Sequence, residues 1–151
     1  MLLTNPRKPL VFVDADVLFA GSASANVNSS SQVVLRLAEI TLIEAITSEQ
    51  VIAECERNLI QKFPSALSSF RLLVDRCLHI VPNPIPGDLA AYQGLADSKD
   101  LPILVAALQA KCPWIVTFNL RHFQPGHQDV QTLRPGDFVL QVRDSLTRII
   151  P

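Results

Sequence analysis

Four polar side chains are the candidates for chemistry in this sequence. Each lies at the start, at the end or on the edge of an apolar segment. Asp14 and Asn119 each follow a short apolar run of the kind that forms a buried strand. Asp100 opens a long apolar helix, and Glu54 lies at the edge of the apolar stripe of another helix. Ligands bind at the carboxyl ends of the strands in an open parallel sheet, so we expect these four side chains to converge at one edge.

The chemistry that suits this set is the binding of a hard divalent cation. Three of the four side chains are carboxylates, which repel one another unless they are protonated or neutralised by a cation. Ligands that are all oxygen select Mg²⁺ or Mn²⁺ over zinc. Asp14, Glu54, Asp100 and Asn119 are therefore predicted to hold one or two such ions. A bound ion would activate water for attack on a phosphodiester and stabilise the charge on the leaving oxygen.

The elements that must position these residues alternate between strands and helices. Short apolar runs predict strands over residues 10–13, 43–46, 78–81 and 114–118, with a fifth, edge strand over 130–133. Helices are predicted over 32–39, 47–62, 64–76, 89–95 and 101–111, while residues 22–31 suit a loop or a helix start and the segment from 135 a helix or a strand. Residues 47–50 resemble a capping box that would open the second helix. This order indicates an α/β fold with a mostly parallel, twisted sheet of four to five strands.

Length and composition limit the class of protein. The chain has 151 residues, with 13 basic and 14 acidic side chains and a formal net charge of −1. The length indicates a single domain spanning residues 1–151. An apolar content of 48% with 18% charged residues argues against disorder. The near-neutral charge excludes a protein that holds nucleic acid by bulk basicity, although a local basic patch stays open.

Cysteine usage and charge placement indicate a soluble, cytoplasmic protein with no membrane partner. Cys55, Cys77 and Cys112 are odd in number and form no CxxC pair, which favours reduced, buried thiols over disulfides or a zinc site. Asp14 and Asp16 interrupt the apolar run near the N-terminus, where a secretory signal carries no charge. No stretch approaches the roughly 20 apolar residues that span a bilayer.

Four segments resemble, in order and with similar spacing, the motifs of the PIN-domain nuclease family. They are VFVDADVL at 11–18, TSEQVIAE at 47–54, DSKDLPILVAAL at 97–108 and IVTFNLRHF at 115–123. One such motif is weakly specific, whereas four in order are fairly specific. The resemblance covers about residues 10–123 and implies a small, toxin-like bacterial protein with a three-layer α/β/α PIN-like fold and metal-dependent ribonuclease activity.

Residue by residue, the resemblance places the three family acids at Asp14, Glu54 and Asp100 and implies a catalytic role for them. Many members carry Asp in the fourth motif, but a branch of the family has Asn there, as this chain has Asn119. An amide oxygen can coordinate a cation but brings no charge, so the resemblance implies a second metal site with fewer charged ligands.

Three further residues are candidates for supporting roles. Asp16 or Asp97 could supply the missing carboxylate, and Thr117 could orient a ligand. Each has an ordinary structural interpretation as well, Asp16 as a helix cap and Thr117 as a β-branched strand residue. The principal acids share this ambiguity, because carboxylates are common at strand ends and in the first turns of helices. His122 and His127 are interpreted as surface residues.

These patterns favour a metal-dependent endoribonuclease that cuts single-stranded RNA or an exposed RNA loop, with the choice of RNA resting on the resemblance. Many small bacterial members are toxins held by an antitoxin, so an antitoxin partner and a homodimer are further expectations. No substrate-binding residue is assigned. Four basic side chains could meet phosphates, although solvated charge is their default role: Arg57, Lys62, Arg71 and Arg121.

Two alternatives stay open. Asn119 and the low basic charge would suit a degenerate PIN-like module that binds RNA or protein without efficient cleavage. Asp14-Ala15-Asp16 after an apolar strand would suit a haloacid-dehalogenase-like phosphatase. We rank the phosphatase low, because the residues after Asp16 are out of step with that motif and no later lysine motif accompanies the paired acids.

Overall fold

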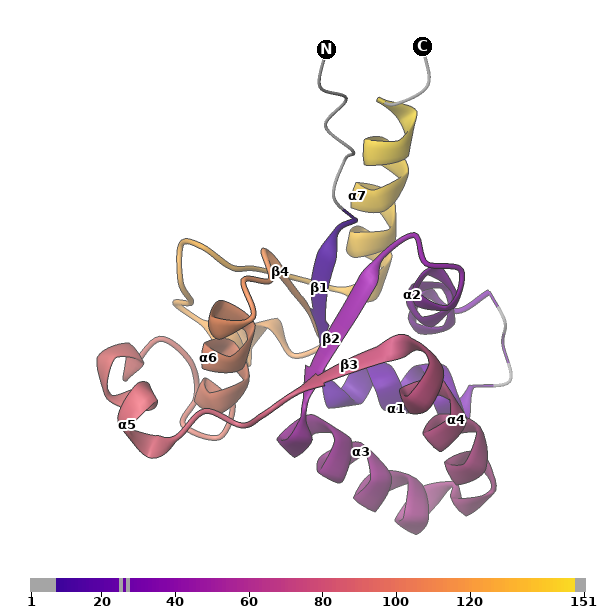
Figure 1. The fold of residues 1–151 in the computed structure, drawn as a ribbon, viewed down its shortest axis with the longest axis horizontal. Coiled ribbons are helices and arrows are strands. Elements are labelled where there is room, and N and C mark those ends of the chain that lie inside the picture. Colours follow the sequence, from indigo (N-terminus) through magenta and orange to yellow (C-terminus); the bar gives the residue numbers. More distant parts are fainter. Residues whose placement is uncertain (1–7, 25, 27, 149–151) are drawn as a thin grey trace.

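The computed structural model describes residues 8–24, 26 and 28–148, and its centre is a five-stranded sheet (Figure 1). The strands are β1 (Leu10–Val13), β2 (Glu44–Ser48), β3 (Leu78–Val81), β4 (Trp114–Val116) and β5 (Gln131–Leu133). Their order is β3-β2-β1-β4-β5, and every neighbouring pair is parallel. The α/β fold with a mostly parallel sheet is therefore confirmed, and the fifth strand lies at an edge as predicted.

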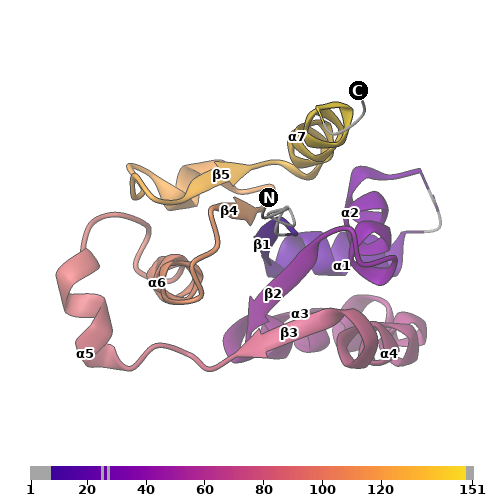
Figure 2. The same cartoon turned by 45° about the horizontal axis from the view of Figure 1, so that its top comes forward.

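Helices cover both faces of this sheet. They are α1 (Ala15–Ala23), α2 (Ser30–Glu39), α3 (Glu49–Lys62), α4 (Leu67–Cys77), α5 (Pro86–Leu89), α6 (Leu101–Gln109) and α7 (Pro135–Thr147), with 3₁₀ turns η1 (Pro64–Ala66), η2 (Ala90–Tyr92) and η3 (Leu120–Phe123). Figure 2 shows α5 and α6 on one side of the sheet and α1 to α4 with α7 on the other, which gives the three layers expected. Within the described ranges, no helix has both the length and the hydrophobicity that crossing a membrane requires.

The order of the strands creates a switch point between β1 and β4. The chain runs outward from β1 to β2 and β3, and then returns to place β4 on the other side of β1. In open α/β sheets such a reversal leaves a crevice outside the carboxyl ends of the two strands, and ligands bind there. The residues that follow β1 and β4 therefore face the most favourable position for a site.

Burial on both faces explains why the central strands are continuously apolar. Val11, Phe12 and Val13 of β1 are fully buried, and so are Ile115 and Val116 of β4. A parallel strand with helices on both faces has no solvent side and shows no polar alternation. Helix α6 is buried nearly all round in the same way. These elements hold the ends of β1 and β4 in a rigid frame.

Helix α1 differs from the sequence-based expectation. No helix is predicted over 15–23, yet α1 occupies this segment directly after β1. Its N-cap is Asp14 and not Asp16, because Asp14 Oδ1 accepts a hydrogen bond from the backbone N–H of Ala15 at 2.8 Å. Asp16 lies in the first turn, where a carboxylate is favoured by the helix dipole.

The start of α3 also differs from the predicted capping box. The N-cap is Ser48 and not Thr47, since Ser48 Oγ accepts a hydrogen bond from the Val51 N–H at 3.4 Å. The buried Thr47 hydroxyl donates instead to the carbonyl oxygen of Val13, at 3.0 Å. Serine and threonine both cap helices well. Here the hydroxyl of Thr47 is already used in the hydrogen bond to Val13, so Ser48 is the residue that caps α3.

Other predicted bounds shift by a few residues. Strand β2 covers 44–48 where 43–46 was expected, and β4 ends at 116 where 118 was expected. The helix expected over 89–95 is the single turn α5 followed by the 3₁₀ turn η2. The segment from 135 is a helix. Residues 22–31 include the end of α1 and the start of α2, with residues 25 and 27 outside the described part.

Candidate functional site

A small pocket lies at the switch point, outside the carboxyl ends of β1 and β4. It has a volume of about 80 Å³. Its lining includes the four side chains predicted to converge, together with Asp16 and two basic residues: Asp14, Ala15, Asp16, Glu54, Lys99, Asp100, Asn119 and His122. We call this the acidic pocket, because four of its eight lining residues carry carboxylates.

Asp14 is held in place by the two central strands. Its backbone N–H donates to the carbonyl oxygen of Val116 at 3.0 Å, which ties the end of β1 to the end of β4. The residue is only 6% exposed. One carboxylate oxygen caps α1, and the other accepts a hydrogen bond from the Thr117 hydroxyl at 2.9 Å. Both oxygens are therefore fixed by neighbours before any ligand is considered.

Thr117 connects the two sides of the acidic pocket. Its buried hydroxyl, which donates to Asp14, also accepts a hydrogen bond from the backbone N–H of Asn119 at 3.1 Å. Asp16 Oδ2 accepts the backbone N–H of Phe118 at 3.0 Å and lies 3.4 Å from the Thr117 hydroxyl. The segment after β4 is thus hydrogen-bonded to both acids that follow β1, which supports the orienting role expected of Thr117.

Asp100 reaches the same pocket from the start of α6, and His122 reaches it from η3. The Asp100 Oδ2 atom lies 3.1 Å from His122 Nδ1. Burial raises the pKa of Asp100, while the charges of His122 and Lys99 oppose that rise. The backbone N–H of Asp97 donates to the His122 carbonyl oxygen at 2.8 Å and so joins the third and fourth motifs.

Asp97, Asp100 and His122 form the one compact group of possible metal ligands among the described residues. Their ligand atoms lie within 4.8 Å of one another. Asp97 is exposed and does not line the acidic pocket, so it stands at the rim. Asp14 and Glu54 line the pocket but lie outside this compact group.

The charges in the acidic pocket are poorly compensated. The pKa of Asp14 is raised from 3.8 to about 7, chiefly by burial and also by the charges of Asp16 and Asp100. Hydrogen bonds from Ala15 and Thr117 lower it, but less than burial raises it. Burial likewise raises the pKa of Asp16. Each of these shifts records a carboxylate whose negative charge lacks a partner.

The donor set fits a divalent cation. Asp16 Oδ1 is buried and has no hydrogen-bond partner among the described residues, although it belongs to a charged group beside the pocket. An orphaned buried carboxylate oxygen is costly unless an ion or a water molecule satisfies it. Carboxylate and amide oxygens converging on one pocket are the ligands that Mg²⁺ and Mn²⁺ prefer.

The structure brings together all four predicted ligands, while their roles as ligands and catalytic groups stay predictions. Asn119 is exposed and lines the acidic pocket as expected. His122 was interpreted as a surface residue, and half of its side chain is exposed, but it also lines the pocket. The sequence patterns assign no role to Lys99, which also lines the pocket. Lys99 and His122 both lie within the segments that resemble PIN-family motifs. Their position in these motifs is the sequence feature from which a place at the site could be predicted.

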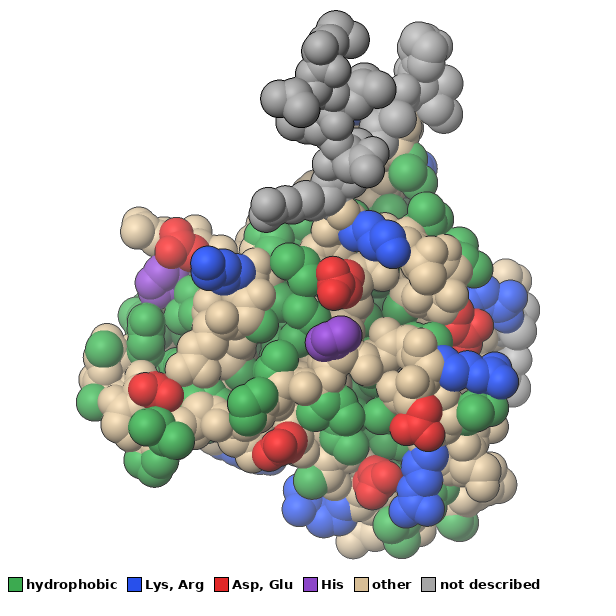
Figure 3. Space-filling model, viewed as in Figure 1, with side chains coloured by type: hydrophobic (Ala, Val, Ile, Leu, Met, Phe, Trp, Pro, Cys, Tyr) green, Lys and Arg blue, Asp and Glu red, His purple; other side chains and the backbone are tan. Residues whose placement is uncertain are grey.

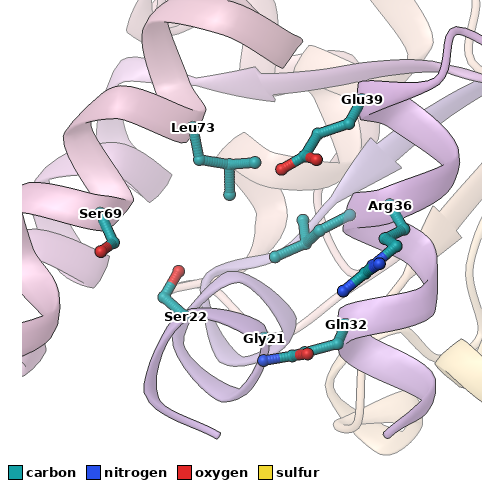
Figure 4. A pocket seen from close by; sticks show the side chains of 8 residues that line it. Gly21, Ser22, Gln32, Arg36, Glu39, Ser69 and Leu73 are labelled. Atoms are coloured by element: carbon teal, nitrogen blue, oxygen red, sulfur yellow. The ribbon is translucent and has the colours of Figure 1, made fainter. Parts of the chain in front are cut away.

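Larger hollows lie elsewhere on the molecule. A cavity of about 320 Å³ between α1, α2 and α4 is lined by residues such as Ser22, Arg36 and Glu39 and shares none with the acidic pocket (Figure 4). Glu39 is its one acidic residue, so it has no carboxylate cluster. On the face in Figure 3, acidic and basic side chains are interspersed, in agreement with the near-zero net charge.

The Thr47 hydrogen bond holds the end of β1 next to Asp14, and its removal should lower stability. Thr47→Val keeps the shape but leaves the Val13 carbonyl oxygen without this donor at the end of β1. We expect the free energy of unfolding to fall by about 1–3 kcal/mol, as for other buried groups left unsatisfied. Thr132→Val in β5 is the matched control and should change stability by less than about 0.5 kcal/mol. Urea unfolding of the three proteins measures the difference, and equal effects of the two substitutions would contradict the role of Thr47.

The parallel sheet with acidic side chains at its switch point agrees with the match of this sequence to a known protein family. Residues 10–121 match the sequence model of the PIN domain, and the chain belongs to this family. A comparison with curated proteins finds no match.

Among solved structures, the chain is similar to a chain of VapBC2 from Rickettsia felis, in a crystal structure bound to a DNA fragment from their promoter. The match has a TM-score of 0.58 at 15% sequence identity and covers 82% of this chain and 98% of that chain. At this identity the likeness supports the fold alone, and it agrees with the three-layer architecture described above.

Proposed function

We propose that this protein is a metal-dependent endoribonuclease that hydrolyses phosphodiester bonds of single-stranded RNA in the cytoplasm. The observation that carries the proposal is the acidic pocket itself. In a PIN-domain chain, four carboxylates line one pocket at the switch point: one follows β1, two lie on α1 and α3, and one precedes α6. One of their buried oxygens has no partner among the described residues.

In the proposed site, Asp14, Glu54, Asp100 and Asn119 hold one or two Mg²⁺ or Mn²⁺ ions. When bound, the metal supplies an activated water and neutralises charge on the phosphate. Asp14 is fixed for this task by Thr117, and Asp16 by the Phe118 N–H. Asp16 is the better candidate for an additional carboxylate, because it lines the pocket whereas Asp97 lies at the rim.

The direct test is cleavage of labelled single-stranded RNA with Mn²⁺, with Mg²⁺ and with EDTA. We expect metal-dependent cleavage by the wild type, and a loss of about 100-fold or more in Asp14→Asn, which removes a charged ligand. Asp75→Asn, at an exposed position on α4, is the matched control and should cleave as the wild type does. Equal cleavage by Asp14→Asn and wild type would contradict the proposal, and hydrolysis of small phosphoesters instead would favour the phosphatase alternative.

The degenerate-module alternative has one observation in its favour. Asn119 places a neutral amide on the acidic pocket where many family members carry a carboxylate. A module of this kind would bind RNA with similar affinity in wild type and Asp14→Asn, and it would cleave with neither metal.

An antitoxin partner and a homodimer belong to the same proposal. The support for the partner is that the similar chain comes from VapBC2, which was crystallised with a DNA fragment from their promoter. The homodimer rests on the family resemblance and on the apolar content of 48%. Co-purification with the product of a neighbouring reading frame tests the partner. Light scattering tests the dimer, and a mass near 16.6 kDa at all concentrations would contradict it.

Asn119→Asp should change stability in opposite directions with and without metal. The new charge adds to the repulsion among the acids of the empty pocket, so the melting temperature in EDTA should fall by roughly 2–4 °C, or about 1 kcal/mol. The same charge is a better ligand for a hard cation, so the rise on adding Mg²⁺ or Mn²⁺ should be larger than in wild type. Asn28→Asp, at an exposed position outside the pocket, should show neither effect. If Asn119→Asp melts as wild type does in both buffers, Asn119 is not a ligand.

A further inference from the structure

A second, basic pocket adjoins the acidic pocket. It has a volume of about 260 Å³ and is lined by Phe118, Asn119, Leu120, Arg121, His122 and Arg134. We call it the arginine pocket, because none of its lining residues is acidic and two are arginines. Asn119 and His122 line both pockets, so the two are contiguous.

Backbone hydrogen bonds fix this neighbourhood. The N–H of Thr117 donates to the carbonyl oxygen of Leu133 at 3.0 Å, which brings the end of β5, and with it Arg134, beside the segment that follows β4. The N–H of Phe118 is held by Asp16 of the acidic pocket. Phe118 and Arg134 are therefore carried by the same frame as the acids, although they are distant in sequence.

The side chains of the arginine pocket are available for a ligand. Phe118 is 44% exposed, so its ring is accessible to a base. Arg121 and Arg134 are also exposed, and within the described part of the chain neither lies within 4.0 Å of a carboxylate oxygen. An unpaired guanidinium is a strong donor to phosphate oxygens.

We propose that the arginine pocket binds the nucleotide next to the cleaved bond, with a base stacked on the Phe118 ring and phosphate oxygens held by Arg121 and Arg134. This inference rests on the proposed nuclease function and adds the substrate-binding residues that the acidic pocket lacks. A cluster of carboxylates repels a polyanion, so the substrate needs positive charge beside the metal site. Aromatic stacking with cationic contacts to the backbone is how single strands are bound without sequence preference.

The chemistry of this pocket does not distinguish RNA from DNA. A ring that stacks on a base and guanidinium groups that bind phosphate make no contact that depends on the 2′-hydroxyl. We therefore expect single-stranded RNA and DNA of one sequence to respond alike to substitutions here. Duplexes should bind more weakly, since their bases are not free to stack on Phe118.

The test is the affinity of a labelled ten-nucleotide RNA, and of the matching DNA, in EDTA so that no metal-dependent cleavage occurs. Phe118→Leu should raise Kd about tenfold, within the range measured for loss of one stacking side chain, and Phe118→Trp should restore binding. Phe63→Leu is the matched control, because Phe63 is 47% exposed at the end of α3 and lines neither pocket. Its Kd should stay within twofold of wild type.

Salt dependence tests the two arginines separately. Arg121→Gln and Arg134→Gln should each reduce the slope of log K against log salt by about 0.7, the value for one phosphate contact on a single strand. Arg76→Gln, in the last turn of α4, should leave the slope unchanged. A wild type that binds neither oligonucleotide, or a Phe118→Leu that binds both as wild type does, overturns the proposal.

The outcomes separate this inference from the proposed function. Metal-dependent cleavage by the wild type, together with unchanged binding by the Phe118 and arginine variants, would keep the nuclease and reject the arginine pocket. Reduced binding by these variants, in a protein that cleaves no RNA with any metal, would keep the arginine pocket as a single-strand-binding site and reject both the nuclease and the placement beside a cleaved bond.

Discussion

Millimolar Mn²⁺ or Mg²⁺ should raise the melting temperature of the wild type, and Asp14→Asn or Asp100→Asn should remove that rise. A ligand that binds only the folded state adds stability by mass action, about 2.7 kcal/mol at 100 times Kd. For a chain of this length, that corresponds to a rise of roughly 5–10 °C. The measurement is a thermal melt in EDTA and in each metal.

The control for the metal experiment is Asp75→Asn, whose carboxylate is exposed on α4 and lies outside the acidic pocket. Its metal-dependent rise should equal that of the wild type. In EDTA, Asp14→Asn should itself melt no lower than wild type at pH 8, because it relieves charge repulsion in the pocket. An unchanged metal effect in both Asp14→Asn and Asp100→Asn would exclude these two residues from the ligand set.

Without metal, Asp14 should make the protein less stable as the pH rises from about 4 to 7. The folded-state pKa of about 7 exceeds the ordinary value of 3.8, so between these limits the folded state holds a proton that the unfolded state has released. This contribution is complete below about pH 4, declines as the pH approaches 7 and is constant above that. A shift of this size corresponds to about 4 kcal/mol.

The pH effect is isolated by comparing wild type with Asp14→Asn. The difference in free energy of unfolding between the two should move in favour of Asp14→Asn as the pH is raised from 4 to 8 in EDTA. Burial also raises the pKa values of Asp16 and Asp100, and this burial is present in both proteins, so it does not by itself produce the difference. Saturating Mg²⁺ should abolish the trend, because a bound cation favours the ionised carboxylate. A pH-independent difference in EDTA would mean that Asp14 titrates normally.

The centre of the sheet could be predicted from sequence because its inner strands carry one unambiguous signal. Val11, Phe12 and Val13 are apolar without interruption, as parallel strands covered on both faces must be. Helix α1 could not be found by the same reasoning, since it is apolar on nearly every side and shows little periodicity. The cap of α3 could not be chosen either, because the hydrogen bond from Thr47 to Val13 is a contact 34 residues apart in sequence.

The sequence predicted which acidic and amide side chains meet at the candidate site, but it did not predict all of their neighbours. Strand-end and helix-start positions were enough to bring Asp14, Asp100 and Asn119 to one pocket. They gave no means of seeing that His122 lies beside Asp100, or that the turn after β5 brings Arg134 next to the segment after β4. Those contacts depend on how η3 and β5 pack, which local sequence patterns do not encode.

The hydrogen bond from the Asp14 N–H to Val116 has a consequence for hydrogen exchange. This amide joins the carboxyl ends of the two central strands, beside the fully buried Val13 and Val116, so its proton should exchange with solvent only when the whole molecule unfolds. The residue proposed to bind metal therefore carries its own reporter of global stability. Because a bound ion stabilises the folded state as a whole, the slowing of exchange at Asp14 by Mg²⁺ should equal the gain in unfolding free energy measured by denaturation.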